Sequence, residues 1–86
     1  MTSPVEPQVR AVIVELFLGG DTSFPLEPKT SLIEAGICDS MGLVQLAAAL
    51  EERFPGLRID DQDITHENMG SSLAISEFMQ RRGVRD

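Results

Sequence analysis

Apolar side chains recur at intervals of three and four residues in several stretches of this chain, which is the spacing of one face of an α-helix. The first stretch predicts a helix over about residues 6–18. Pro7 is tolerated in its first turn, and Gly19-Gly20 ends it. The residues expected on its core face are Val5, Val9, Val12, Ile13, Leu16 and Phe17.

The second stretch predicts a helix from about Ser40 to Phe54, where Pro55-Gly56 prevents continuation. Its core face would be formed by Leu43, Leu46, Ala47, Leu50 and Phe54. The same helix carries a second apolar line at Met41, Val44 and Ala48. One core cannot bury both lines unless the buried face is unusually wide, so the second line is expected to be exposed beside Glu51 and Glu52 as a docking face.

Two further helices are expected in the last third of the chain. A short one is capped by Asp60-Asp61 and broken before Met69-Gly70. A longer one is capped by Ser71 or Ser72 and ended by Gly83. Its apolar residues are Leu73, Ala74, Ile75, Phe78 and Met79. No useful run of alternating apolar and polar residues is present, so the pattern predicts an all-α fold with three main helices and one short helix.

About twenty residues separate the first two helices, and a connection of that length without structure would be unusual in a compact domain. Ser31 to Glu34 has the pattern of a capping box that starts one short turn, and Gly36 closes it. The apolar residues expected to anchor the connection are Phe24, Leu26, Leu32, Ile33 and Ile37. We therefore expect an ordered loop lying over the core.

Length and charge narrow the class of function. A chain of 86 residues supports one domain with a modest core and is too short for most folds that build a catalytic cleft between domains. We therefore expect residues 1–86 to form a single non-enzymatic domain. The formal net charge is −7, which repels nucleic acid and anionic membranes and attracts partners rich in Lys and Arg, or serves only to keep the protein in solution.

Cysteine usage and hydropathy bear on the compartment. Cys38 is the only cysteine, so the sequence offers no intramolecular disulfide, zinc cluster or Cys-x-x-Cys pair, and a small apolar filler in a reducing cytoplasm is the simplest interpretation. The most apolar stretch, residues 9–18, contains Arg10 and Glu15, so neither a signal peptide nor a membrane span is expected.

Ser40 is the candidate for chemistry, because it lies where irregular chain gives way to a helix and no side chain is placed to activate it. The unpaired N–H groups and the positive end of the helix dipole would favour a negatively charged group, such as a phosphodiester, on its hydroxyl. Ser40 is thus a better attachment point than a catalyst. The alternative is that Asp39 or Ser40 serves only as a helix N-cap.

Other chemistries fit the sequence poorly. A nucleophile elbow would need glycine where Cys38 stands. His66, the only histidine, follows a helix of about 22 Å and is expected to be solvated rather than paired with Ser40. The acidic residues after Ile59 lack the spacing of a calcium loop, so no metal site is expected, and Gly19-Gly20 lacks the rest of a phosphate-binding loop.

The segment from Leu32 to Phe54 resembles the acyl carrier protein family. Its Asp39-Ser40-Met41 is similar to the family's Asp-Ser-Leu motif, and it feeds an apolar helix that ends in Leu-Glu-Glu-Arg-Phe. The order of helices and the long loop extend the resemblance over nearly the whole chain. It implies a four-helix bundle of the acyl carrier protein type.

The resemblance also implies a function. Ser40 would receive a 4′-phosphopantetheine arm from coenzyme A through a phosphopantetheinyl transferase, making the chain a phosphoprotein whose arm carries an acyl or aminoacyl group as a thioester. Asp39 would help the transferase recognise the site. Exposed docking positions would be Met41, Val44 and Ala48, with Glu51 and Glu52 as an acidic rim. Partners would be the transferase, a loading enzyme and downstream transferases or synthases of a biosynthetic pathway, and the carrier would act as a monomer.

Departures from the family pattern bear on the cargo. Gly42 and Gln45 are neutral where carriers of fatty acid synthesis usually have acidic residues, and Arg53 replaces a commonly acidic position. These differences favour an aminoacyl or specialised acyl pathway over fatty acid synthesis, which stays the alternative. A hypothesis of another class is an unmodified acidic module that binds a basic partner through Met41, Val44 and Ala48.

Overall fold

The computed structural model describes residues 5–21, 23 and 26–84, and all regular structure within them is helical. The helices are α1 (Glu6–Phe17), α2 (Ser40–Arg53), α3 (His66–Met69) and α4 (Ser72–Arg81), with a 3-10 turn at Asp61–Asp63. The predicted all-α bundle of three main helices and one short helix is confirmed. None of the described helices is both long and apolar enough to span a bilayer.

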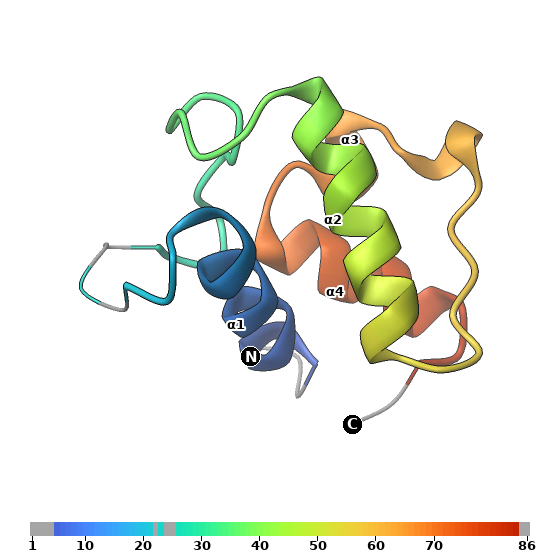
Figure 1. The fold of residues 1–86 in the computed structure, drawn as a ribbon. Coiled ribbons are helices and arrows are strands. Elements are labelled where there is room, and N and C mark those ends of the chain that lie inside the picture. The colour runs from blue at the N-terminus through green and yellow to red at the C-terminus, as the bar shows by residue number, and fades with distance from the viewer. Residues whose placement is uncertain (1–4, 22, 24–25, 85–86) are drawn as a thin grey trace.

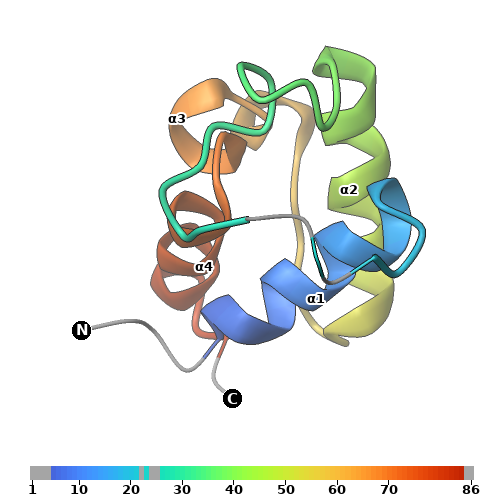
Figure 2. The ribbon, with the colours of Figure 1, turned by 90° about the vertical axis from the view of Figure 1, so that its left-hand side faces the viewer.

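Helices α1, α2 and α4 surround one apolar core, and α3 lies between the start of α2 and α4 (Figures 1 and 2). The predicted core face of α2 is confirmed: Leu43, Leu46, Ala47 and Leu50 are buried, and Phe54 packs against them. Buried apolar residues from elsewhere in the chain are Val5, Val9, Val12, Ile13, Leu26, Leu32, Leu57, Met69, Ile75, Phe78 and Met79.

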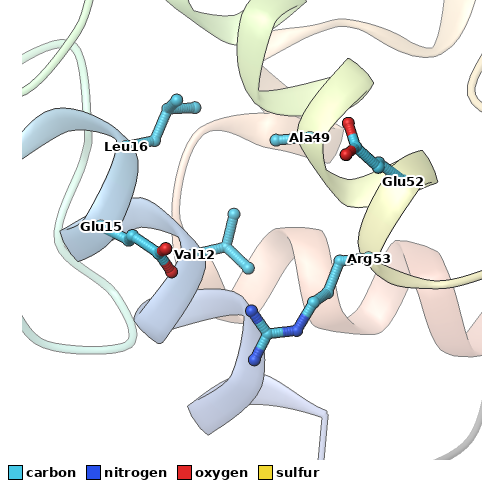
Figure 3. A pocket seen from close by; sticks show the side chains of 6 residues that line it. All are labelled: Val12, Glu15, Leu16, Ala49, Glu52 and Arg53. Atoms are coloured by element: carbon cyan, nitrogen blue, oxygen red, sulfur yellow. The ribbon is translucent and has the colours of Figure 1, made fainter.

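Two residues assigned to the core are exposed instead. The prediction for Leu16 is wrong, since its side chain is 42% exposed. The residue of α2 that faces it is Ala49, whose side chain is too short to cover it (Figure 3). Ile33 is 37% exposed because Leu32, the preceding residue of the same tight turn, takes the core position. Phe24, also expected as an anchor, lies outside the described residues.

The short third helix is divided, where a single segment was expected. In the first part the N–H of Asp63 donates to the carbonyl of Asp60 (2.8 Å), and the N–H of Asp60 donates to Oδ2 of Asp63 (3.0 Å). A second N-cap follows at Thr65, whose Oγ1 accepts from the N–H of Asn68 (3.1 Å) and begins α3. Two caps five residues apart therefore separate a 3-10 turn from a one-turn helix.

The long connection between α1 and α2 is held by backbone hydrogen bonds to the C-terminal third of the chain. The N–H of Leu32 donates to the carbonyl of Gly70 (2.8 Å), and the N–H of Leu73 donates to the carbonyl of Pro28 (2.9 Å). Together with buried Leu26 and Leu32, these bonds lay residues 26–37 over the core. The prediction of an ordered loop is confirmed for this part.

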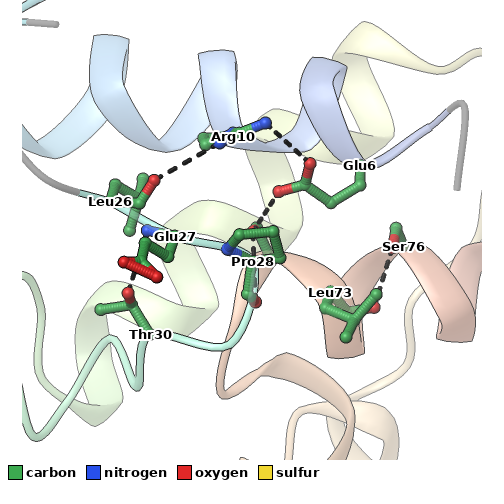
Figure 4. Close-up of polar contacts among 9 residues, drawn as sticks. Glu6, Arg10, Leu26, Glu27, Pro28, Thr30, Leu73 and Ser76 are labelled. Atoms are coloured by element: carbon green, nitrogen blue, oxygen red, sulfur yellow. Dashed lines mark hydrogen bonds and ion pairs between the residues drawn. The ribbon is translucent and has the colours of Figure 1, made fainter. Parts of the chain in front are cut away.

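A buried carboxylate that the sequence did not reveal joins α1, this loop and α4 (Figure 4). Glu6 is completely buried, and its Oε2 accepts from the Oγ of Ser72 at 2.5 Å. Its Oε1 accepts from Arg10 at 3.0 Å, and Arg10 also reaches the carbonyl of Leu26 at 3.4 Å. A buried charge is tolerated only with such partners, so Glu6 ties three segments together.

Candidate functional site

Ser40 is the first residue of α2 and is exposed. The start of α2 lies at the upper end of the molecule in Figure 1. Within the described part of the chain, the hydroxyl of Ser40 makes no hydrogen bond. The first N–H groups of a helix have no partner inside the helix, so they lie beside this hydroxyl together with the positive end of the dipole. The geometry leaves the hydroxyl open to another molecule.

Asp39, and not Ser40, is the N-cap of α2. Its backbone is extended (φ −106°, ψ −171°), and its Oδ1 accepts a hydrogen bond from the N–H of Gly42 at 2.8 Å. This arrangement is the usual role of an aspartate at the start of a helix. Of the two N-cap candidates, the structure confirms Asp39 as the cap, and the interpretation of Ser40 as the cap is wrong.

A tight turn presents this helix start. The N–H of Gly36 donates to the carbonyl of Ile33 (3.0 Å), and the N–H of Ile37 donates to the carbonyl of Leu32 (2.9 Å). These two bonds form a Schellman motif, in which the residue at the position of Gly36 has a positive φ, here +75°. The predicted closure of the turn by Gly36 is confirmed, and the turn fixes where Asp39 and Ser40 emerge.

Gly42, in the first turn of α2, allows the residues before the helix to pack closely against it. An added Cβ on Gly42 would stand 2.6 Å from Cβ of Cys38 and 3.3 Å from Cε1 of Phe17. A glycine inside a helix costs about 0.5–1 kcal/mol relative to alanine. The close approach of Cys38 explains why glycine stands here despite that cost, which the sequence alone did not reveal.

The thiol of Cys38 is a poor nucleophile in this setting. Burial raises its pKa, and the negative charge of the neighbouring Asp39 raises it further. Cys38 packs against the apolar core, which confirms its interpretation as a small filler. Among the described residues no group of three or more His, Cys, Asp or Glu side chains could hold a metal ion.

Comparison with known proteins gives the site its context. The family model described as phosphopantetheine attachment site matches residues 11–73, which is most of the chain and includes all of α2. The chain belongs to the phosphopantetheine-binding carrier family. No match was found among curated proteins or among solved structures. Membership makes this chain a carrier with a 4′-phosphopantetheine prosthetic group that interacts with a phosphopantetheinyl transferase and with partner enzymes.

The start of α2 fits that prosthetic group. Attachment needs an accessible hydroxyl and an environment that accepts a phosphodiester, and Ser40 has both an exposed side chain and a helix N-terminus beneath it. Asp39 satisfies one N–H of the first turn, and no acidic residue lies within that turn itself. When bound, the group would supply a flexible thiol that forms thioesters.

The second apolar line of the carrier's α2 is exposed, as predicted. Met41 is 68% exposed, Val44 is 48% exposed, and Ala48 is also exposed. Glu52 is exposed on the same helix. Glu51 is half-buried, and its Oε2 accepts from the N–H of Ile59 at 2.7 Å. Glu51 therefore holds the chain after α2 and is only partly exposed, while its part in an acidic docking rim stays a prediction.

Polar residues after α2 have structural roles. His66 is exposed at the first position of α3, as expected for a solvated residue. Asp63 forms an ion pair with Arg82 at 2.8 Å and thereby joins the 3-10 turn to the end of α4. Arg82 also stacks over the ring of Phe78, 4.9 Å from its centroid. The acidic segment is thus partly neutralised inside the fold.

Proposed function

We propose that Ser40 is the attachment point of the carrier's phosphopantetheine arm and that the chain presents an acyl or aminoacyl thioester to other enzymes. The observation that supports this most strongly is that Asp39 and Ser40 have different roles at the start of α2. Asp39 makes the capping bond, so the neighbouring hydroxyl of Ser40 is exposed and unused. The chain holds and orients the arm, and the chemistry of loading and transfer belongs to its partners.

The residues around Ser40 have distinct parts in this proposal. Asp39 fixes the first turn and provides a negative charge that a basic transferase surface can recognise. Met41, Val44 and Ala48 offer an apolar strip to partner enzymes, and Glu52 adds a negative charge on the same side. Burial of a strip of this kind against a partner would supply affinity, while the charges would steer association.

The cargo that we propose is aminoacyl or specialised acyl. The first turn of α2 after Asp39 contains no acidic residue, and Arg53 adds a positive charge at its last turn. A partner of this carrier must therefore accept a helix less negative than those typical of fatty acid synthesis. A fatty acyl intermediate remains the alternative cargo.

We further propose that residues 1–86 act as one monomeric domain in the cytoplasm, with no catalysis of their own. The single core joins α1, α2 and α4, which supports one unit. The lone cysteine, half-buried and with a raised pKa, suits a reducing compartment in which the thiol of the arm stays available.

The competing function is an unmodified interaction module that uses the strip at Met41, Val44 and Ala48. An experiment distinguishes the two functions when it detects a thioester on the protein rather than binding to a partner. After treatment with coenzyme A and a transferase, a carrier accepts cargo on the thiol of its arm as a thioester. Hydroxylamine releases that cargo, and Ser40→Ala abolishes the loading. An interaction module would bind its partner equally well with and without that substitution, and the wild type would acquire no hydroxylamine-sensitive cargo.

A further inference from the structure

An open groove between α1 and α2 shares only Glu52 with the docking strip described above. We call it the α1–α2 groove, and it is lined by Val12, Glu15, Leu16, Ala49, Glu52 and Arg53 (Figure 3). Its floor is apolar, since Val12 is buried, and Leu16 and Ala49 point toward one another across it. Leu16 is one of the few large apolar side chains of the described chain that remain exposed.

The groove is a space between the two helices that no side chain of this protein fills. Ala49 stands where a longer side chain would fill the space and cover Leu16, and the molecule leaves that space open. An aliphatic side chain entering between them would remove apolar surface from water on both walls. The apolar floor therefore fits one inserted aliphatic side chain.

Charges at the rim indicate what surrounds that side chain. Glu15 on α1 and Glu52 on α2 are both exposed, and neither has an ion pair within the described residues. Arg53 reaches from α2 toward Val12 at one end of the groove and is likewise unpaired there. Two carboxylates on opposite walls favour a cation above the groove, in line with the net charge of −7.

The groove is also within reach of any enzyme that acts on Ser40. Ala49 lies nine residues after Ser40 on the same helix, a distance of about 14 Å along its axis. A standard interface of about 800 Å² per partner corresponds to a disc of about 16 Å radius. The row Met41, Gln45, Ala49 connects the two places, because these residues are four apart and share one face of α2.

We propose that the α1–α2 groove is a second docking surface for the phosphopantetheinyl transferase, which inserts an aliphatic side chain between Leu16 and Ala49 and sets a lysine or arginine over Glu15 and Glu52. This rests on the proposed attachment at Ser40. It adds α1 to the recognised surface, whereas the proposed function uses only α2.

The test is the steady-state KM and kcat of transfer from coenzyme A to the full-length carrier, measured by intact mass. Ala49→Leu fills the groove and covers Leu16, so its melting temperature should equal or exceed that of the wild type while KM rises about tenfold. Glu15→Lys with Glu52→Lys should raise KM about tenfold with little change in kcat. Arg53→Gln should lower KM, because it removes the one positive charge near the proposed cation.

Matched controls separate the groove from general effects. Glu27→Lys with Glu77→Lys changes the net charge by the same amount at two exposed residues outside the groove, and KM should stay within about twofold. Leu16→Ala, which trims one wall of the groove at an exposed position, should raise KM. Should Ala49→Leu fail to fold, the exposed charge variants still decide the question.

Several results would overturn the proposal. KM within about twofold of wild type for both Ala49→Leu and the Glu15, Glu52 pair would show that the transferase leaves the groove empty. An equal rise in KM for the control pair would assign the effect to net charge. A wild-type dimer that Ala49→Leu dissociates would show a second copy of the chain in the groove. A wild type that accepts no phosphopantetheine at all would instead refute attachment at Ser40.

Discussion

At the scale of single residues, the start of α2 is specified by a few atoms. Asp39 caps the helix, Gly36 turns the chain with a positive φ, and Gly42 lets Cys38 approach the first turn of the helix. Because Asp39 makes the capping bond, the hydroxyl of Ser40 has no structural role at the helix start. The exposed hydroxyl is thus a consequence of how its neighbours are used.

Gly42→Ala should destabilise the protein although alanine favours helices. The added Cβ meets Cβ of Cys38 at 2.6 Å, and relieving such overpacking costs about 1–3 kcal/mol. Urea denaturation measures the change in the free energy of unfolding. Cys38→Gly in the same chain removes the opposing atom and should recover part of the loss, whereas Cys38→Ala keeps that Cβ and should not. Full stability of Gly42→Ala alone would show that the contact is not tight.

Asp39→Asn should make Cys38 more reactive. Burial raises the pKa of this thiol, and the charge of Asp39 raises it further, so removing the charge lowers the pKa and increases the thiolate fraction at a given pH. The rate of alkylation by iodoacetamide, measured from pH 7 to 9 in the apo protein, should begin to rise at a lower pH in the variant. Asparagine is also a good N-cap, so helix stability should change little. Identical rate profiles would mean that the Asp39 charge does not act on the thiol.

At the scale of elements, the periodicity of apolar residues was enough to place the main helices and most of the core. The sequence failed where the outcome depends on what lies opposite. Leu16 follows the helical period yet is exposed, because Ala49 on the facing helix is short. Glu6 is charged yet buried, because two side chains reach its carboxylate: Ser72, which is 66 positions away in the sequence, and Arg10, which is four positions away. Arg10 is the i+4 neighbour of Glu6 in the same helix, a pair that local pattern does allow, but Ser72 could not be read from it.

Ser72→Ala should be much more damaging than Ser76→Ala, although both serines are fully buried on α4. Ser72 donates to the buried carboxylate of Glu6, and losing a hydrogen bond to a charged group costs about 1.5–3 kcal/mol. Ser76 bonds only to the carbonyl of Leu73 in its own helix, a contact that alanine dispenses with easily. Chemical denaturation of the two variants measures the difference. Equal losses would contradict the assigned role of Glu6.

Val44→Asp tests the exposed strip of α2. Because Val44 is 48% exposed, the variant should keep its melting temperature within a few degrees while partner enzymes turn over more slowly. Leu46→Asp, in the fully buried row of the same helix, should unfold the protein. Circular dichroism reports folding, and transfer from coenzyme A reports function. A large loss of stability for Val44→Asp would show that the strip belongs to the core.

At the scale of the whole molecule, the fold presents the start of α2 at one end, with α1 and α4 below it (Figure 1). The family model, the helix order and the exposed Ser40 agree on a carrier that holds a phosphopantetheine arm. Thioester chemistry takes place at the end of this arm, so every step of the proposed function depends on its attachment. The attachment itself is therefore the claim to test.

The most direct measurement is the intact mass of the protein after incubation with coenzyme A and a broad-specificity phosphopantetheinyl transferase, with Ser40→Ala as control. The account predicts a gain of one phosphopantetheine on the wild type, none on the control, and a fragment ion that places the group on Ser40. An unmodified wild type that is well folded in the presence of an active transferase, or a group found on another serine, would contradict it.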